Sequence, residues 1–364
     1  MKNLTLAVAC VSLMAGVPTS LRAQTGPISP VRFADVEGPN SNTLPLAHAQ
    51  QLVRFQQIQD DLPIRARLVR ALAFRRNAVD ASFTPFAVDL DLTMSDPARS
   101  SASPSIVFAQ NHGTNLVTVV ARRTIQFPGT LTPRSRPAPF EYLIPLDAPY
   151  RVSVATCWDM RVYSHGATNT EFDAVQSPAG DQNPTSGAHF FGTGCRASGS
   201  SQPMVAGGSF SGDWSLGTFS LRFTSQRGPA NAPHLVAVGF DNQQWGQLPL
   251  PFLLPGSLNA PSGPCFIEND ILDTLPGTSN GVGTFVTTLG VTLDPAQNGL
   301  RIFSQVIALD AGANSLGVVT SNGGVRQIVA PFARPSIAQI SLLGSHGTSG
   351  TAATGVGVVT RLVE

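Results

Sequence analysis

From residue 64 to the C-terminus, short apolar runs alternate with turns rich in Gly, Pro, Asn and Ser, at a spacing of roughly 8–12 residues. Residues 86–92 show this most clearly, because three aliphatic residues alternate there with Asp89 and Asp91. No long amphipathic helix pattern follows residue 64. The chain is therefore predicted to be all-β, with two β-sandwich or jelly-roll modules, and not an α/β fold.

The N-terminus has the pattern of a secretory signal peptide. Lys2 precedes an uncharged apolar stretch at residues 4–17, and Ala23 provides a small residue before the polar chain begins. The stretch is shorter than the ~20 apolar residues that a membrane span needs. We therefore expect residues 1–23 to be removed, with no transmembrane segment, and the mature chain to be secreted as an extracellular, periplasmic or cell-surface protein. Lipidation at Cys10 is the alternative, but it would leave a very short apolar region.

Composition excludes several kinds of partner and chemistry. Without Lys2 and Arg22, 21 of the 23 basic residues remain against 22 acidic residues, so the mature chain has a net charge of −1. This balance gives no electrostatic attraction toward nucleic acid. Because Lys2 is the only lysine, the mature chain can form no lysine Schiff base and contains no P-loop lysine.

The length of the mature chain suggests about two domains. We expect a loose leader at residues 24–45, a larger β-sandwich module at residues 46–245, and a smaller β-sandwich module with C-terminal strands at residues 246–364. Residues 52–62 fit either a short helix or an irregular start of the first strand. Residues 163–203 are expected to form a long loop, and Asn322 with Gly323 indicates a hairpin, since both residues tolerate positive φ.

Three cysteines, Cys157, Cys195 and Cys265, remain after the signal peptide. An oxidising compartment favours one disulfide. We expect it between Cys157 and Cys195, because both fall in the first module and the bond would fix the loop at residues 163–203. Cys265 would then be a buried free thiol. A catalytic thiol is the alternative for Cys265, but the next histidine along the chain is His346.

Seven short phrases are distinctive as a set, namely residues 54–58, 72–76, 111–115, 157–162, 228–233, 309–314 and 320–323. Together they resemble a large group of uncharacterised secreted proteins from planctomycete-type bacteria. The resemblance covers residues 50–330. It implies a secreted, β-rich chain in two modules, and it implies no catalytic or binding residue because the function of that group is unknown.

Residues 277–281 match the G-x-S-x-G string of α/β-hydrolase nucleophile elbows, with Ser279 in the position of the nucleophile. The elbow requires a strand before the serine and a helix after it. Here Pro276 precedes the string and a strand-like run follows it. We therefore expect that Ser279 is not a nucleophile.

Asp89 and Asp91 share one face of a predicted strand. Neighbouring positions of this kind are normally the solvent face, but two carboxylates at this spacing could also bind Ca²⁺ or flank a glycosidic bond. Three histidines, His112, His165 and His346, each precede a glycine, and none has the spacing of zinc ligands. No metal ligand is therefore predicted, and no cofactor is expected; Ca²⁺ at Asp89 and Asp91 is the alternative.

The chain holds 3 Trp and 3 Tyr against 20 Phe. This balance favours buried aromatic side chains over sugar-binding platforms. Trp158 is expected to pack on the disulfide. Trp245 is the tryptophan expected to be exposed, and together with Asp89 and Asp91 it is a candidate ligand-binding residue.

These observations predict a secreted, non-enzymatic protein that serves in binding or in structure outside the cell. The alternative is a carbohydrate-binding protein or a divergent glycoside hydrolase on a jelly roll. Two carboxylates from different strands beneath an exposed tryptophan would favour the alternative. Dispersed carboxylates on a flat surface would favour the structural interpretation.

Overall fold

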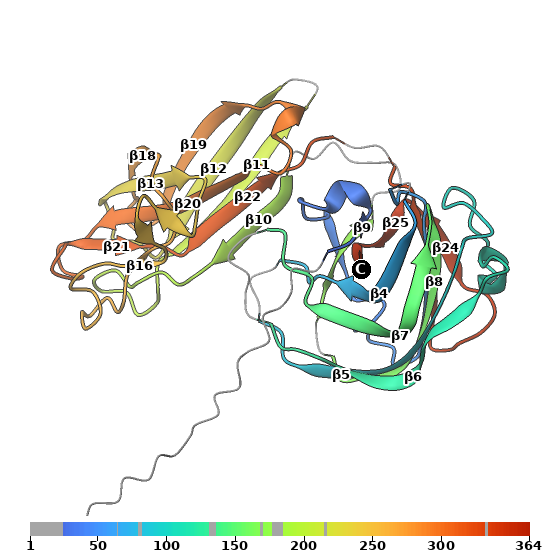
Figure 1. Ribbon diagram of the computed structural model, residues 1–364. Coiled ribbons are helices and arrows are strands. Elements are labelled where there is room, and N and C mark those ends of the chain that lie inside the picture. Colours follow the sequence, from blue (N-terminus) through green and yellow to red (C-terminus); the bar gives the residue numbers. More distant parts are fainter. Residues whose placement is uncertain are drawn as a thin grey trace, which may run out of the picture.

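The computed structural model describes residues 25–63, 65–78, 82–130, 136–167, 170–176, 185–214, 217–331 and 334–364. Strands and bridges make up 52% of the described residues and helical turns 3%, so the predicted all-β sandwich class is confirmed. The strands form two bodies, which lie on the two sides of Figure 1. The predicted signal peptide at residues 1–23 lies outside the described residues. Within the described ranges, no helix is long and apolar enough to cross a membrane.

The first body packs a six-stranded antiparallel sheet against two smaller sheets. The six-stranded sheet has the order β24 (Thr351–Thr354), β23 (Ile337–Leu343), β3 (Val53–Gln59), β8 (Thr156–His165), β5 (Phe86–Ser95) and β6 (Val117–Phe127). The second sheet has the order β1 (Ile28–Ser29), β26 (Thr360–Val363), β4 (Arg67–Phe74) and β7 (Tyr142–Val152). The third has the order β2 (Asn40–Asn42), β9 (Phe172–Gln176) and β25 (Val356–Val358). Two short 3₁₀ turns, η1 (Val31–Phe33) and η2 (Phe108–Asn111), lie in its loops.

Alternation along the strands decides which face of the six-stranded sheet is covered. In β5, the aliphatic residues are buried in the core, while Asp89 and Asp91 lie half-buried on the other face. Trp158 of β8 stacks on Phe55 of β3, with ring centroids 5.4 Å apart. The six-stranded sheet therefore has an apolar inner face and a polar outer face. The strands beside β5 also carry polar residues on this outer face.

The second body is a smaller β-sandwich. One sheet has the order β10 (Thr185–Phe191), β22 (Gly323–Ile328), β20 (Arg301–Leu309), β13 (Pro233–Gly239) and β18 (Asp273–Thr278), with β21 (Val318–Thr320) paired to β20. The facing sheet contains β11 (Val205–Asp213), β12 (Thr218–Gln226) and β19 (Phe285–Thr292). Two small hairpins, β14 (Gln244–Trp245) with β15 (Leu248–Pro249) and β16 (Phe252–Leu253) with β17 (Phe266–Ile267), and the 3₁₀ turn η3 (Pro295–Gln297) complete it. Val236 and Ile328 of the first sheet pack with Phe223 and Phe285 of the second.

The hydrogen-bonded sheets do not divide at residues 245 and 246 as expected from the sequence. Strand β13 pairs with both β18 and β20, which lie beyond that point. The C-terminal strands return to the first body, where β23 pairs with β3 and β26 pairs with β4. The chain thus enters the second body at β10, leaves it after β22, and completes the first body with its tail. Local turn signals mark breaks between strands, but they do not reveal which distant strand becomes the partner.

Two local expectations also differ from the structure, and one open choice is decided. The expected long loop at residues 163–203 contains β9 and β10, and the segment at residues 52–62, which fitted a short helix or the start of a strand, contains β3. The expected hairpin at Asn322 and Gly323 does not form, because β21 and β22 both pair with β20 and not with each other. Instead, the Asn322 side chain accepts a hydrogen bond from the backbone N–H of Ala206 at 2.7 Å, which links the two sheets of the second body.

The two bodies meet where the N-terminal segment of the first lies against β22 and the residues after it. The Gln327 side chain accepts from the backbone N–H of Glu37 at 3.0 Å and donates to the carbonyl of Asp35 at 2.6 Å. Val329 packs into a small core with Phe33 of the first body. The joint therefore combines buried hydrogen bonds with apolar contact.

Candidate functional site

The disulfide joins Cys195 to Cys265, so the predicted Cys157–Cys195 bond is wrong. Cys157 lies on β8 in the first body, where it is a buried free thiol. Cys195 lies in the second body, in the segment that follows β10. The prediction failed because the segment between these two cysteines is not a single loop but crosses from one body to the other.

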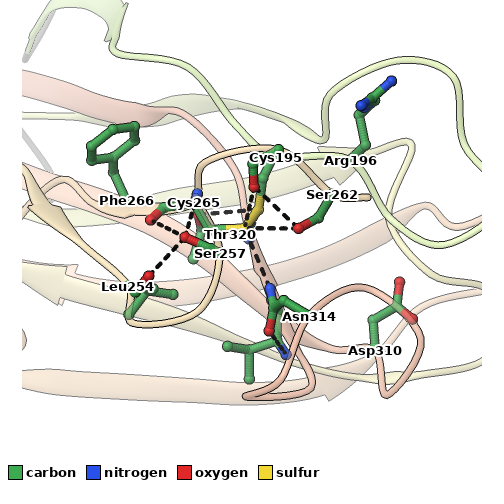
Figure 2. Close-up of a disulfide and its surroundings, with 12 residues drawn as sticks. Cys195, Arg196, Leu254, Ser257, Ser262, Cys265, Phe266, Asp310, Asn314 and Thr320 are labelled. Atoms are coloured by element: carbon green, nitrogen blue, oxygen red, sulfur yellow. Dashed lines mark hydrogen bonds between the residues drawn. A yellow bond between two sulfur atoms is a disulfide. The ribbon is translucent and has the colours of Figure 1, made fainter. Parts of the chain in front are cut away.

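Figure 2 shows that the disulfide is enclosed by polar groups of the second body. The backbone N–H of Thr320 points to Cys195 Sγ at 3.1 Å, and Asn314 Nδ2 points to Cys265 Sγ at 3.6 Å. The Ser257 hydroxyl accepts from the backbone N–H of Cys265 at 3.1 Å and donates to a neighbouring carbonyl. The bond therefore fixes the loops at this end of the second body. Burial raises the pKa of the remaining thiol, Cys157, well above its usual value, which keeps it protonated and unreactive.

Ser279 lies in a turn between β18 and β19, and not between a strand and a helix. It is buried. Its hydroxyl donates to the carbonyl of Pro229 at 2.6 Å and accepts from the backbone N–H of Ala232 at 3.0 Å. The hydroxyl therefore holds a neighbouring turn in place, and the G-x-S-x-G string lacks the local structure of a nucleophile elbow.

Asp89 and Asp91 lie on the polar outer face of the six-stranded sheet, and both are engaged by neighbouring side chains. Arg122 of β6 donates to Asp89 through Nε at 3.1 Å and Nη2 at 2.7 Å. The hydroxyl of Tyr163 donates to Asp91 at 2.6 Å. The guanidinium carbon of Arg122 also lies 3.7 Å from the centre of the Tyr163 ring. Among the described residues, no group of three or more His, Cys, Asp and Glu side chains could hold a metal ion.

A denser polar cluster lies farther along the same face, and the sequence did not predict it. Arg54 of β3 donates to Asp159 of β8 through both Nε (3.2 and 3.3 Å) and Nη2 (2.7 Å). His112, from the loop after η2, lies with Nε2 3.4 Å from Asp159 and with Nδ1 2.7 Å from the hydroxyl of Ser95. Gln56 of β3 completes the cluster, with Nε2 3.0 Å from His112 Nε2. A serine, a histidine and an aspartate are thus in contact in series.

The surroundings of Gln56 decide which nitrogen of His112 carries the proton. The Gln56 Oε1 accepts from the Asn111 side chain at 2.7 Å, and its Nε2 donates to the carbonyl of Phe108 at 3.1 Å. These two contacts fix the amide so that Nε2 is a donor toward His112. In the neutral ring, Nε2 therefore accepts, the proton resides on Nδ1, and the Ser95 hydroxyl accepts it. In this tautomer His112 cannot take a proton from Ser95, unlike the base of a catalytic triad.

The polar cluster holds two loops onto the sheet. Burial would raise the pKa of Asp159, but hydrogen bonds and positive charge from its partners outweigh burial and place the pKa below the usual value, and Arg54 at 2.7 Å makes the shortest of these contacts. The Arg54 guanidinium also lies 4.1 Å from the centre of the Phe108 ring and donates to the carbonyl of Gly347 at 2.8 Å. One arginine therefore links the sheet to the loop around η2 and to the loop after β23.

The sequence did not reveal this cluster because its members are adjacent only when β3, β8 and β5 are paired. Arg54 and Gln56 follow one alternation of β3, and β3 lies against β8 in the register that places Gln56 opposite Asp159. The remaining two His-Gly histidines are not part of the cluster. His165 contacts the carbonyl of His48 at 2.6 Å, and His346 contacts the carbonyl of Val162 at 2.8 Å.

A second buried cluster lies beneath the joint between the bodies. Arg75 of β4 donates to Asp173 of β9 at 2.6 Å and to the carbonyls of Phe33 at 2.7 Å and Val36 at 2.6 Å. Both charged side chains are fully buried. Arg75 therefore fixes the segment that contacts the second body.

Glu37 lies in this joint with a buried carboxylate. One of its oxygens accepts from the backbone N–H of Ala78, and its other oxygen, Oε2, has no hydrogen-bond partner among the described residues. Burial and, after it, the charge of Asp173 raise the pKa of Glu37 to about 7, against the opposing effects of Arg136 and Arg75. Because Arg75 contacts Asp173 directly, Asp173 keeps the ion pair and Glu37 is the carboxylate that takes up the proton first.

Trp245 is 37% exposed on the hairpin formed by β14 and β15, and the other two tryptophans are more enclosed. Trp158 is fully buried against Phe55 and does not contact the disulfide, which lies in the other body. Trp214 donates from its indole to the carbonyl of Val329 at 3.1 Å. Trp245 lies in the second body, whereas Asp89 and Asp91 lie in the first, so the three predicted ligand-binding residues do not share one site.

Comparison with known proteins provides no relative from which a role could be transferred: no family model, no curated protein and no solved structure matches the chain. The assignment of function therefore depends on the geometry of the chain's own residues.

Proposed function

We propose that the chain is exported and acts outside the cytoplasm as a non-enzymatic binding or structural protein. The observation that supports this most is the pairing of the candidate reactive groups on the outer face of the six-stranded sheet. Asp159 is held by Arg54, Asp89 by Arg122, and Asp91 by Tyr163. A general acid needs a raised pKa, whereas the pKa of Asp159 is lowered by its partners. These contacts stabilise the loops, and they engage the carboxylates in structural hydrogen bonds and ion pairs.

Export is tested by N-terminal sequencing of the protein recovered outside the cytoplasm. The signal-peptide pattern predicts a mature N-terminus at or close to Gln24. An unprocessed Met1, or a lipid attached to Cys10, would contradict this assignment.

The non-enzymatic role is tested with the full mature chain on a polysaccharide array, where binding and hydrolysis are measured together. We expect no hydrolysis of any glycan, and no labelling by a fluorophosphonate probe. Hydrolysis that is lost in Asp159→Asn but retained in Asp147→Asn would contradict the proposal, because Asp147 lies in an exposed ion pair on the same body. Stoichiometric labelling of Ser95 or Ser279 would contradict it too.

Carbohydrate binding is the second candidate, and the exposure of Trp245 favours it. An exposed indole provides a flat apolar surface with a polar edge, which suits the faces of sugar rings. Asp241 orders the loop beside it, since its carboxylate accepts from the backbone N–H of Gln243 at 2.7 Å. On the same array, Trp245→Ala is expected to abolish any binding, while Leu258→Ala, which removes another exposed apolar side chain of the second body, retains it. Equal binding by both variants would exclude Trp245 as the contact.

A further inference from the structure

Arg326 of β22 is a buried arginine of the second body that lies beside an aromatic ring and not beside a carboxylate. Only 1% of the residue is exposed. Its guanidinium carbon lies 5.4 Å from the centre of the Phe223 ring on the facing sheet. Within the described part of the chain, its Nε and Nη2 atoms are buried and have no hydrogen-bond partner. A cation–π contact offsets only part of the cost of removing a guanidinium from water.

The two unpartnered nitrogens are the same pair that other arginines of this chain use to bind a carboxylate. Arg54 donates to Asp159 through Nε and Nη2, and Arg122 donates to Asp89 through Nε and Nη2. This edge of a guanidinium presents two parallel N–H groups whose spacing matches two oxygens of an oxyanion. In Arg326 both nitrogens of that edge are buried, and no acceptor among the described residues contacts them.

Small residues of the neighbouring strands lie directly beside this edge. Gly208 of β11 lies beside it, and a Cβ at that position would come within 2.5 Å of Arg326 Nη2. Gly208 has a φ of +147°, a conformation that L side chains rarely adopt. Arg326 is opposite Ala188 on β10, so small residues flank it on that side too. Burial lowers the pKa of Arg326 to about 10, so the side chain still carries its positive charge at neutral pH.

We propose that the Nε–Nη2 edge of Arg326 binds one small oxyanion, a carboxylate or a sulfate, between the two sheets of the second body. Two parallel hydrogen bonds to the anion would satisfy both nitrogens and compensate the buried charge. The near-complete burial of Arg326 restricts the ligand to a small ion, because a polymer could not reach it. The site is separate from the surface of the proposed binding function and does not depend on it.

The test is thermal unfolding of the full mature chain in sodium acetate and, separately, in sodium sulfate, each exchanged against sodium chloride at constant ionic strength. Arg326→Met removes the charge with similar side-chain volume, and Arg222→Met on the neighbouring β12 removes an exposed charge as the matched control. We expect the transition of the second body to rise saturably with acetate, sulfate or both in the wild type and in Arg222→Met, and to be insensitive in Arg326→Met. At 100 times the dissociation constant, the shift should reach several degrees, roughly 5–10 °C for a domain of this size.

The same anion dependence in the wild type and in Arg326→Met would overturn the proposal, because it would reflect general salt effects. If Arg326→Met fails to fold, equilibrium dialysis of the wild-type protein with radiolabelled acetate and sulfate decides the question. Saturable binding of one anion per chain, weakened at least about tenfold in Arg326→Lys, supports a site that requires the two-pronged guanidinium. An absence of saturable binding of both anions to the wild type overturns it.

Discussion

Two buried arginines of the first body, Arg54 and Arg75, are paired with carboxylates, whereas the second body buries Arg326 against a phenyl ring. Arg54 and Arg75 each contact an aspartate that is itself buried, and each also donates to loop carbonyls. These ion pairs fix loops and the joint between the bodies. The comparison shows that a buried arginine can be paired with a carboxylate in one body and lie against an aromatic ring in the other.

The bodies also differ in how their chains are held. The second body contains the Cys195–Cys265 bond, while the first has a buried free thiol at Cys157. The first body instead depends on strands from both ends of the sequence, since β23 and β26 pair with β3 and β4. We therefore expect ion-pair variants to weaken the first body and cysteine variants to weaken the second.

The largest effect is expected when the buried pair at the joint is broken. Asp173→Ala leaves Arg75 buried without its carboxylate, and this should lower the free energy of unfolding by about 3–5 kcal/mol. Asp147→Ala is the control, because surface pairs such as that of Asp147 with Arg123 contribute about 0–1 kcal/mol. Urea unfolding of both variants measures the difference. Similar losses in the two variants would show that the buried pair has no special role.

A second variant tests the body that lacks this pairing. Replacing Cys195 and Cys265 together by Ala should lower the stability of the second body by about 2–5 kcal/mol. Differential scanning calorimetry should show the transition of the second body shifted and that of the first retained. Cys157→Ala, which removes a buried thiol from the other body, should shift the first transition instead. A shift of both transitions in either variant would contradict the assignment of separate stabilising elements.

Glu37 provides a smaller, pH-dependent effect at the joint. Its pKa is about 7 in the folded chain against an ordinary value of 4.5, so the folded state binds this proton more tightly. The stabilisation of the folded state by this proton is fully present below about pH 4.5 and is lost as the pH rises through 7. Glu37→Gln, which keeps the shape without the charge, should therefore be more stable than the wild type above pH 7, by roughly 3 kcal/mol at most. The two proteins should converge near pH 4.5, and a constant difference across this range would show that Glu37 does not titrate as described.

The class of fold could be predicted from sequence because alternation is a local property. The run at residues 86–92 gave both the existence of β5 and the faces of Asp89 and Asp91. Ser279 could also be placed in a turn between strands, since Pro276 and the run after it are local signals.

Partners far apart in sequence could not be predicted. Strand β23 pairs with β3, and this pairing returns the tail to the first body. The composition of the two segments does not indicate that they pair. The same limitation caused the wrong disulfide, because Cys195 and Cys265 are brought together by the second body's loops and not by their neighbours in sequence. The cluster of Arg54, Asp159 and His112 depends on strand register and on a loop, so none of these residues is distinctive alone.

The central claim is that the polar cluster on the six-stranded sheet is structural, and the tautomer of His112 tests it most directly. Nitrogen-15 spectra of the imidazole rings, with His112→Gln used for assignment, distinguish a protonated nitrogen from an unprotonated one. In the neutral ring, we expect the proton on Nδ1, donated to Ser95, with Nε2 accepting from Gln56. A proton on Nε2, with Nδ1 accepting from the Ser95 hydroxyl, would place a base beside a serine and contradict the claim.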